Sequence, residues 1–201
     1  MKKLLIATHN PGKIKEFKLF LEGEPFEIVS LSDVGITDDV EEDGKTYQEN
    51  SQKKALFYAQ KSGLPALSDD GGLEIVALDN QPGIHSRRWL GYTATDEALI
   101  EHMKKISKKL PDTNRKAFFK TVVSVALPDG QVWSVMGDVE GIIAKEPLLK
   151  LSKGYPYRSF FYLPQLNKYY FETELTPEEL KKYNHRYKAV QNIKQVLKKL
   201  G

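Results

Sequence analysis

The sequence contains no cysteine, and this absence excludes two kinds of structure. None of the 201 residues carries a thiol, so neither a disulfide framework nor a thiolate metal site is available to the chain. The chain also lacks a long apolar run. Its N-terminal run LLIA, residues 4–7, is far too short for a signal peptide or a membrane span. We therefore expect a cytoplasmic protein that folds by burying apolar surface.

A strong excess of charge of one sign is absent as well. The chain has 30 Lys plus Arg against 27 Asp plus Glu, a formal charge of +3. This mild excess does not argue for a nucleic acid or an anionic membrane as a partner. Repeats, low-complexity tracts and linkers are also missing, and the length suits one domain. We therefore expect a single domain over residues 1–201.

The apolar periodicity predicts strands and helices that alternate in the first third of the chain, with a hairpin later. Strands are expected at residues 2–8 and 26–31, on either side of residues 69–70, as a hairpin over 116–143, and at 168–172. Helices are expected at residues 12–23, 46–63, 95–110 and 176–200. This order favours an α/β fold with a mixed sheet.

The first loop, THNPGK at residues 8–13, follows a predicted strand and opens a predicted helix. Backbone N–H groups at a helix N-terminus suit a phosphate, and Lys13 follows one turn later. Thr8 and Asn10 can add side-chain donors. The alternative is that Asn10 only caps the helix and that Lys13 is solvated.

Two adjacent acids, Asp69 and Asp70, stand between two apolar runs and precede two glycines. Neighbouring carboxylates repel one another unless a cation or a proton intervenes. Mg²⁺ prefers oxygen ligands and usually also binds substrate phosphates. The stretch VEEDG, residues 40–44, offers a third carboxylate from Glu41, Glu42 or Asp43. The alternative is a polar turn in which the glycines supply positive φ angles.

Two other places carry residues suited to a nucleotide. Asn50 and Lys54 lie four residues apart, on one face of the predicted helix 46–63. His185 and Arg186 lie within the last predicted helix, where they can donate to a base. For both pairs the alternative is a solvated helix face.

Taken in order, these motifs resemble one family, the inosine/xanthosine triphosphate pyrophosphatases. The matching stretches are ATHNPGK, EEDGKTYQENSQKKA, SDDGGLEIVAL, QPGIHSRRWLG, GYPYRSFFYLP and NHR. The resemblance spans nearly the whole chain. It assigns catalysis to Asp70 and Mg²⁺ binding to Glu42, Asp69 and Asp70. It places phosphate contacts at Thr8, Asn10, Lys13 and Lys54, and further matches at Ser86 and Arg88.

The C-terminal half departs from the family pattern. The family's Phe-Gly-Tyr-Asp loop is replaced by Tyr155, Pro156, Tyr157 and Arg158, and the Ser after the acid pair by Gly71. Leu180 stands where the family has a Lys, and the family's Ser-His-Arg is Asn184, His185 and Arg186. The resemblance gives these positions to binding of the base and part of the phosphate.

The resemblance implies an elongated mixed central sheet with flanking helices, in two lobes around a substrate cleft, and a homodimer. It implies Mg²⁺-dependent hydrolysis of inosine, deoxyinosine and xanthosine triphosphates to the monophosphate and pyrophosphate. One alternative is the same chemistry on a modified or pyrimidine nucleotide, because the base loop diverges. Another is a non-catalytic binder of a nucleotide or of single-stranded nucleic acid. A binder has little need of three acids beside a phosphate loop, since carboxylates repel phosphate unless a metal is present.

Overall fold

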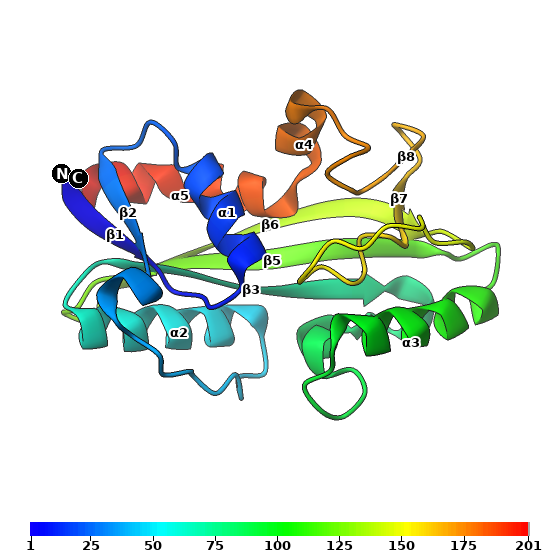
Figure 1. Cartoon of the computed structure of the whole chain (residues 1–201), viewed down its shortest axis with the longest axis horizontal. Helices are drawn as coiled ribbons and strands as arrows, with labels where there is room; N and C mark the ends of the chain where they lie inside the picture. The colour runs from blue at the N-terminus through cyan, green and yellow to red at the C-terminus, as the bar shows by residue number, and fades with distance from the viewer. Residues whose placement is uncertain (201) are drawn as a thin grey trace. The chain divides into compact units, whose positions relative to one another are not determined.

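The computed structural model describes residues 1–200, which divide into two compact units. Unit 1 comprises residues 1–70, 121–137 and 186–200, and unit 2 comprises Gly71–Lys120 and Asp138–His185. Three strands contribute residues to both units: β3 (Ala66–Ile75), β5 (Lys116–Ala126) and β6 (Val132–Ile143). The helices and strands are drawn in Figure 1.

The sheet is mixed, as the sequence predicted. Its strand order is β2-β1-β3-β5-β6-β7-β8, and β4 pairs with β3. β1 runs parallel to both β2 and β3, whereas β3–β4, β6–β7 and β7–β8 are antiparallel. The remaining strands are β1 (Lys2–Ile6), β2 (Phe26–Ser30), β4 (Gln81–Pro82), β7 (Phe161–Leu163) and β8 (Lys168–Tyr169). The predicted hairpin over 116–143 is formed by β5 and β6.

In unit 1, helices cover both faces of the sheet (Figure 1). Alternate residues of β1 point to opposite faces, as the two-residue period of a strand requires. Leu4 and Ile6 pack with α1 (Pro11–Phe20) and α5 (His185–Leu200), whereas Leu5 packs with α2 (Tyr47–Ser62). The first loop is therefore held between a strand whose last three residues are buried and a packed helix.

Unit 2 has a hydrophobic core of its own. Leu99 and Met103 of α3 (Asp96–Lys109) pack against Leu73 and Ile75 of β3. Thr95 caps α3, and a capping box from Thr176 and Glu179 begins α4 (Pro177–Tyr183). Short 3₁₀ helices cover Ser32–Val34, Val76–Leu78 and Gly83–Arg88.

The acid pair does not form the predicted turn. β3 continues from Ala66 to Ile75 through both acids and both glycines, so one strand replaces the two that were expected. Gly71 and Gly72 do not have positive φ angles. A Cβ on Gly72 would lie 2.2 Å from Ser86 Oγ and 2.3 Å from the Gly83 carbonyl oxygen. This glycine therefore serves a close approach of the chain, not a reversal.

The prediction of a single C-terminal helix over 176–200 is also wrong, because two helices, α4 and α5, occupy this range. Asn184 has extended backbone angles, φ −73° and ψ 116°, and separates α4 from α5. The break places His185 and Arg186 in the first turn of α5. Over the described residues, the structure has no helix that is both long and apolar enough to cross a membrane.

Candidate active site

The first loop forms a capped helix N-terminus. Asn10 Oδ1 accepts hydrogen bonds from the backbone N–H groups of Gly12 at 2.9 Å and Lys13 at 3.3 Å. Thr8 Oγ1 accepts from the N–H of Asn10 at 3.2 Å. The capping role considered for Asn10 is therefore present. It orders the loop and leaves the amide nitrogen of Asn10 as the donor of that side chain.

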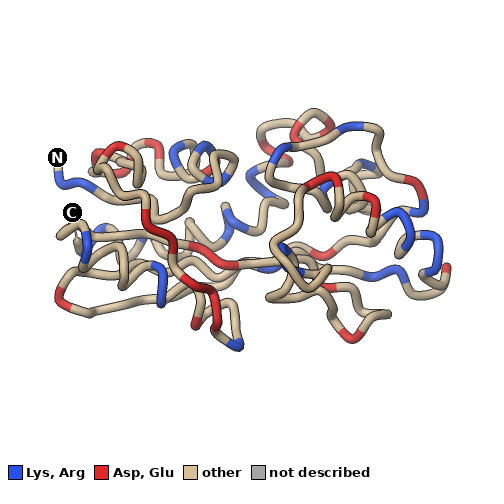
Figure 2. Tube along the Cα trace, turned by 60° about the horizontal axis from the view of Figure 1, so that its bottom comes forward, with Lys and Arg blue, Asp and Glu red and all other residues tan. Residues whose placement is uncertain are grey.

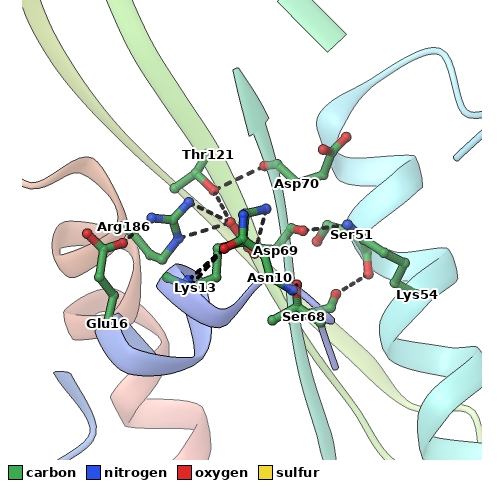
Figure 3. Close-up of polar contacts among 12 residues, drawn as sticks. Asn10, Lys13, Glu16, Ser51, Lys54, Ser68, Asp69, Asp70, Thr121 and Arg186 are labelled. Atoms are coloured by element: carbon green, nitrogen blue, oxygen red, sulfur yellow. Dashed lines mark hydrogen bonds and ion pairs between the residues drawn. The ribbon is translucent and has the colours of Figure 1, made fainter. Parts of the chain in front are cut away.

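Asp69 is fully buried and surrounded by cations (Figure 3). Its Oδ2 accepts from Arg186 Nε at 3.0 Å, and a second guanidinium nitrogen of Arg186 lies 3.0 Å from the same oxygen. Its Oδ1 faces the Lys13 ammonium at 3.0 Å. Burial alone would raise the pKa of Asp69, but the nearby charges of Lys13 and Arg186 outweigh it and hold this pKa far below its usual range.

Asp70, the predicted catalytic acid, has a different environment. Consecutive strand residues point to opposite faces, so Asp70 turns toward α2, where Asn50 Nδ2 donates to its Oδ2 at 3.0 Å. Burial raises the pKa of Asp70, and the negative charge of Glu42 adds to the rise. The two neighbouring acids therefore have pKa values shifted in opposite directions.

Lys54 of α2 is the cation on this side of β3. Its ammonium donates to the Asp69 carbonyl oxygen at 2.7 Å and pairs with the carboxylate of Glu42. Burial would lower the pKa of Lys54, but Glu42, Asp70 and Asp69 together raise it. Lys54 is therefore a charged, buried lysine and not the solvated residue of the alternative interpretation.

The three predicted metal ligands do not form one cluster. Within residues 1–200, no three His, Asp or Glu side chains are grouped so that they could hold a metal ion. The reason is that Asp69 is paired with Lys13 and Arg186, away from the other two acids. Glu42 and Asp70 remain as neighbouring carboxylates, and Mg²⁺ commonly needs only one or two of these beside substrate phosphates. Their oxygen donor set fits that ion.

Arg186, which the resemblance gives to binding of the base and part of the phosphate, is held between two acids. Besides Asp69, its guanidinium pairs with Glu16 of α1, and the side chain is 4% exposed. These contacts assign Arg186 to the charged network of unit 1. Figure 3 shows Arg186 between Glu16 and Asp69.

In unit 2, Arg158 is buried against aromatic rings. Its guanidinium carbon lies 3.7 Å from the centroid of Tyr155 and 5.2 Å from that of Tyr170. Its ion pair with Glu172 is long, at 3.9 Å. The Arg158 cation therefore covers one face of Tyr155, a position that the resemblance gives to binding of the base and part of the phosphate.

The other predicted residues of unit 2 are mostly buried as well. His185 stacks on Phe119, with ring centroids 5.4 Å apart, and its Nδ1 lies 3.0 Å from the hydroxyl of Tyr170. Tyr157 donates to the Ser86 carbonyl oxygen. The remaining positions are Gly71 in β3, Arg88 at the end of a 3₁₀ helix, and Pro156, Leu180 and Asn184, all at least partly buried.

Comparison with known proteins decides the family. A model of the Ham1 family matches residues 4–196. The chain belongs to the Ham1 family. A relative from Bacillus subtilis, named dITP/XTP pyrophosphatase, is 36% identical over 98% of both chains. One of the same name from Thermoanaerobacter pseudethanolicus is 40% identical, again over 98% of both. These names confirm the resemblance identified from the motifs.

Solved structures of Ham1 proteins have the same fold. The Staphylococcus aureus Ham1 protein aligns with a TM-score of 0.81, at 32% identity and over 100% of both chains. A Ham1 protein from Coxiella burnetii aligns with a TM-score of 0.83, also at 32% identity, over 99% of this chain and 100% of that one. The fold class is therefore confirmed.

Sequence reasoning missed two residues of the site in this Ham1 chain. Glu16 pairs with Arg186, and Thr121 Oγ1 lies 3.3 Å from Asp69 Oδ2 and 3.1 Å from the Asp70 carbonyl oxygen. One hydroxyl proton serves one of these acceptors at a time. Glu16 could have been suspected from its position three residues after Lys13 on the predicted helix. Nothing in the sequence pointed to Thr121.

Proposed function

We propose that the chain hydrolyses inosine, deoxyinosine and xanthosine triphosphates to the monophosphate and pyrophosphate, with Mg²⁺ as cofactor. The observation that carries the proposal is the meeting of two lysines, Lys54 buried and Lys13 partly buried, with two aspartates beside a capped helix N-terminus. The pKa values of the two aspartates are shifted in opposite directions. The names of the relatives support the substrate class. The predicted single domain over 1–201, the homodimer and the cytoplasmic location stay part of this proposal.

The lysines and the helix N-terminus suit the triphosphate. Lys13 and Lys54 approach β3 from α1 and α2, and the amide of Asn10 and the hydroxyl of Thr8 add polar groups at the loop. Each lysine is neutralised by an acid in this structure. A bound triphosphate would replace Asp69 Oδ1 as the partner of Lys13 and Glu42 as the partner of Lys54. It would thereby gain charge-assisted contacts in a partly buried site.

Glu42 and Asp70 would hold the metal ion. Bound there, Mg²⁺ would offset negative charge on the phosphate oxygens. Burial raises the pKa of Asp70, and the negative charge of Glu42 adds to the rise, so a bound cation would relieve the repulsion between the two carboxylates. Asp69 would support the site through its ion pairs and not as a ligand.

Asp70 would orient the attacking water and accept its proton. A general base works best when its pKa lies near the working pH, and burial moves the pKa of Asp70 in that direction. The Asn50 amide holds one carboxylate oxygen at 3.0 Å and fixes the side chain.

A second candidate is the same chemistry on a different base, and Arg158 is the observation in its favour. The family's acid at this position is replaced by a buried cation with five donors and no acceptor. A polar pocket discriminates between bases by leaving buried groups unpaired when the wrong base binds. Replacement of an acid by Arg158 changes these groups, so we expect it to alter the base preference. We expect inosine and xanthosine triphosphates to remain preferred over adenosine triphosphate, by a narrower margin than with the intact family loop.

The catalytic assignment is tested by Asp70→Asn. We expect turnover of inosine triphosphate to fall at least about a hundredfold, since the change removes a base and a ligand charge but keeps the shape. The melting temperature should not fall, because a carboxylate whose pKa is raised by burial destabilises the fold when it is ionised.

Asp79→Asn is the matched control. Asp79 is exposed and has a φ of 51°, a conformation that Asn also adopts readily. Turnover by this variant should equal that of the wild type. Near-normal turnover by Asp70→Asn, measured as pyrophosphate release, would rule out the catalytic assignment.

A further inference from the structure

Four charged side chains of alternating sign form a chain through the interior of unit 1. Glu16 of α1 pairs with Arg186 of α5, Arg186 pairs with Asp69 of β3, and Asp69 pairs with Lys13 of α1. The side chains of Asp69 and Arg186 are 0% and 4% exposed, and that of Glu16 is 12% exposed. Solvent therefore screens these pairs poorly.

The middle of this chain has little freedom. Arg186 contacts Asp69 Oδ2 with two nitrogens and Glu16 with a third. Asp69 Oδ1 has no hydrogen bond within the described part of the chain apart from its approach to Lys13. The orientation of the Asp69 carboxylate therefore decides where the Lys13 ammonium lies.

We propose that Glu16 is a positioning residue for the phosphate site: it holds Arg186, which orients Asp69, which places Lys13 for the triphosphate. The inference rests on the proposed function for the identity of its substrate. Glu16 pairs with Arg186, and Arg186 pairs with Asp69, so Glu16 acts on Lys13 through these two side chains.

Removal of Glu16 leaves one end of a buried guanidinium without its acid. Without the opposing charge of Glu16, the guanidinium of Arg186 shifts toward Asp69 and draws the carboxylate oxygens toward itself. Oδ1 turns away from Lys13, and the ammonium loses the contact at 3.0 Å that fixes it. The variant keeps Lys13, but the ammonium is no longer held in one position. This matters because the groups that bind a reacting substrate must be held in a defined geometry.

The molecule offers a matched control in Glu24. Glu24 pairs at 3.1 Å with Lys194, so it also ties the region of α1 to α5. Its side chain is 11% exposed, almost the same as that of Glu16 at 12%. No contact recorded for Glu24 in the described residues reaches Asp69 or Lys13. A merely structural tie between the two segments would make the two glutamates equivalent.

The test is a double-mutant cycle read by binding of inorganic triphosphate in the absence of divalent cations. Glu16→Gln is combined with Lys13→Ala, and Glu24→Gln is combined with the same lysine change. Loss of one negative charge by itself strengthens anion binding in every background, so the coupling is the quantity to compare. We expect at least about fivefold coupling in Kd for Glu16 with Lys13, and less than about twofold for Glu24 with Lys13.

Coupling below about twofold for Glu16, or equal coupling for the two glutamates, would overturn the proposal. Thermal unfolding checks that each variant folds. If Glu16→Gln does not fold, Glu16→Asp replaces it, because it keeps the charge and withdraws it by one methylene group. The same coupling is expected with this variant, and its absence would overturn the proposal equally.

Turnover of inosine triphosphate gives a second readout. Glu16→Gln should lower kcat at least about tenfold and change KM less than about threefold. Loss of the negative charge favours binding of the anionic substrate and offsets the lost orientation in the ground state, but not in the transition state. A rise in KM with unchanged kcat would contradict positioning. If the wild type hydrolyses no nucleotide, the proposed function fails, while the triphosphate coupling still decides the role of Glu16.

Discussion

At the scale of single residues, the two adjacent aspartates lie on opposite faces of β3 and therefore have different electrostatic environments. Asp69 faces Lys13 and Arg186, whereas Asp70 faces Asn50 of α2. Cations lower the pKa of the first despite its burial, and burial raises the pKa of the second. One residue is therefore suited to organise charges and the next to exchange a proton.

Asp69→Asn should destabilise the fold, in contrast to Asp70→Asn. The change leaves Arg186 and Lys13 without their shared acid, and breaking a buried pair typically costs about 3–5 kcal/mol. The free energy of unfolding at pH 7, from denaturant titration, measures this loss. A cost below about 1 kcal/mol, which is typical of an exposed pair, would contradict the network described for unit 1.

The same residue contributes a pH dependence of defined sign. Because its pKa is lower in the folded protein than the ordinary 3.8, Asp69 stabilises the fold above that value. The contribution is lost as the pH falls from about 3.8 toward the lower folded pKa. Wild-type stability should therefore fall more steeply with acid than that of Asp69→Asn, and equal slopes would contradict the assignment.

At the scale of elements, β3 carries the site because it stays extended across the acids and glycines. Gly72→Ala should destabilise the protein by about 1–3 kcal/mol, the range for overpacking in a core. The added Cβ would meet Ser86 Oγ at 2.2 Å and the Gly83 backbone oxygen at 2.3 Å. Melting temperature measures the loss. An unchanged value would show that the two segments lie farther apart than described.

The extended form of β3 also marks the limit of sequence reasoning. Local patterns predicted most strands and helices, the capped loop and the helical position of Lys54. An acid pair followed by glycines is typical of a turn, because the groups that stabilise it as a strand lie far away in sequence. Arg186 is 117 residues from Asp69 and 170 from Glu16. Such ion pairs appear only once the chain is folded.

At the scale of the whole molecule, the resemblance and the comparisons agree over nearly the full length. The Ham1 family model covers residues 4–196, and the solved relatives align over all or almost all of the chain. Basic and acidic residues are interspersed along the trace, as the small net charge leads one to expect (Figure 2).

The most direct test of the account is product analysis with Mg²⁺ over a panel of inosine, xanthosine, adenosine and pyrimidine triphosphates. The account predicts one pyrophosphate for each nucleoside monophosphate formed, and a higher kcat/KM for inosine than for adenosine triphosphate. Best activity on a pyrimidine triphosphate, or an inosine-to-adenosine ratio at or below unity, would favour the second candidate. Release of single phosphates, or no hydrolysis of any triphosphate, would contradict the central claim.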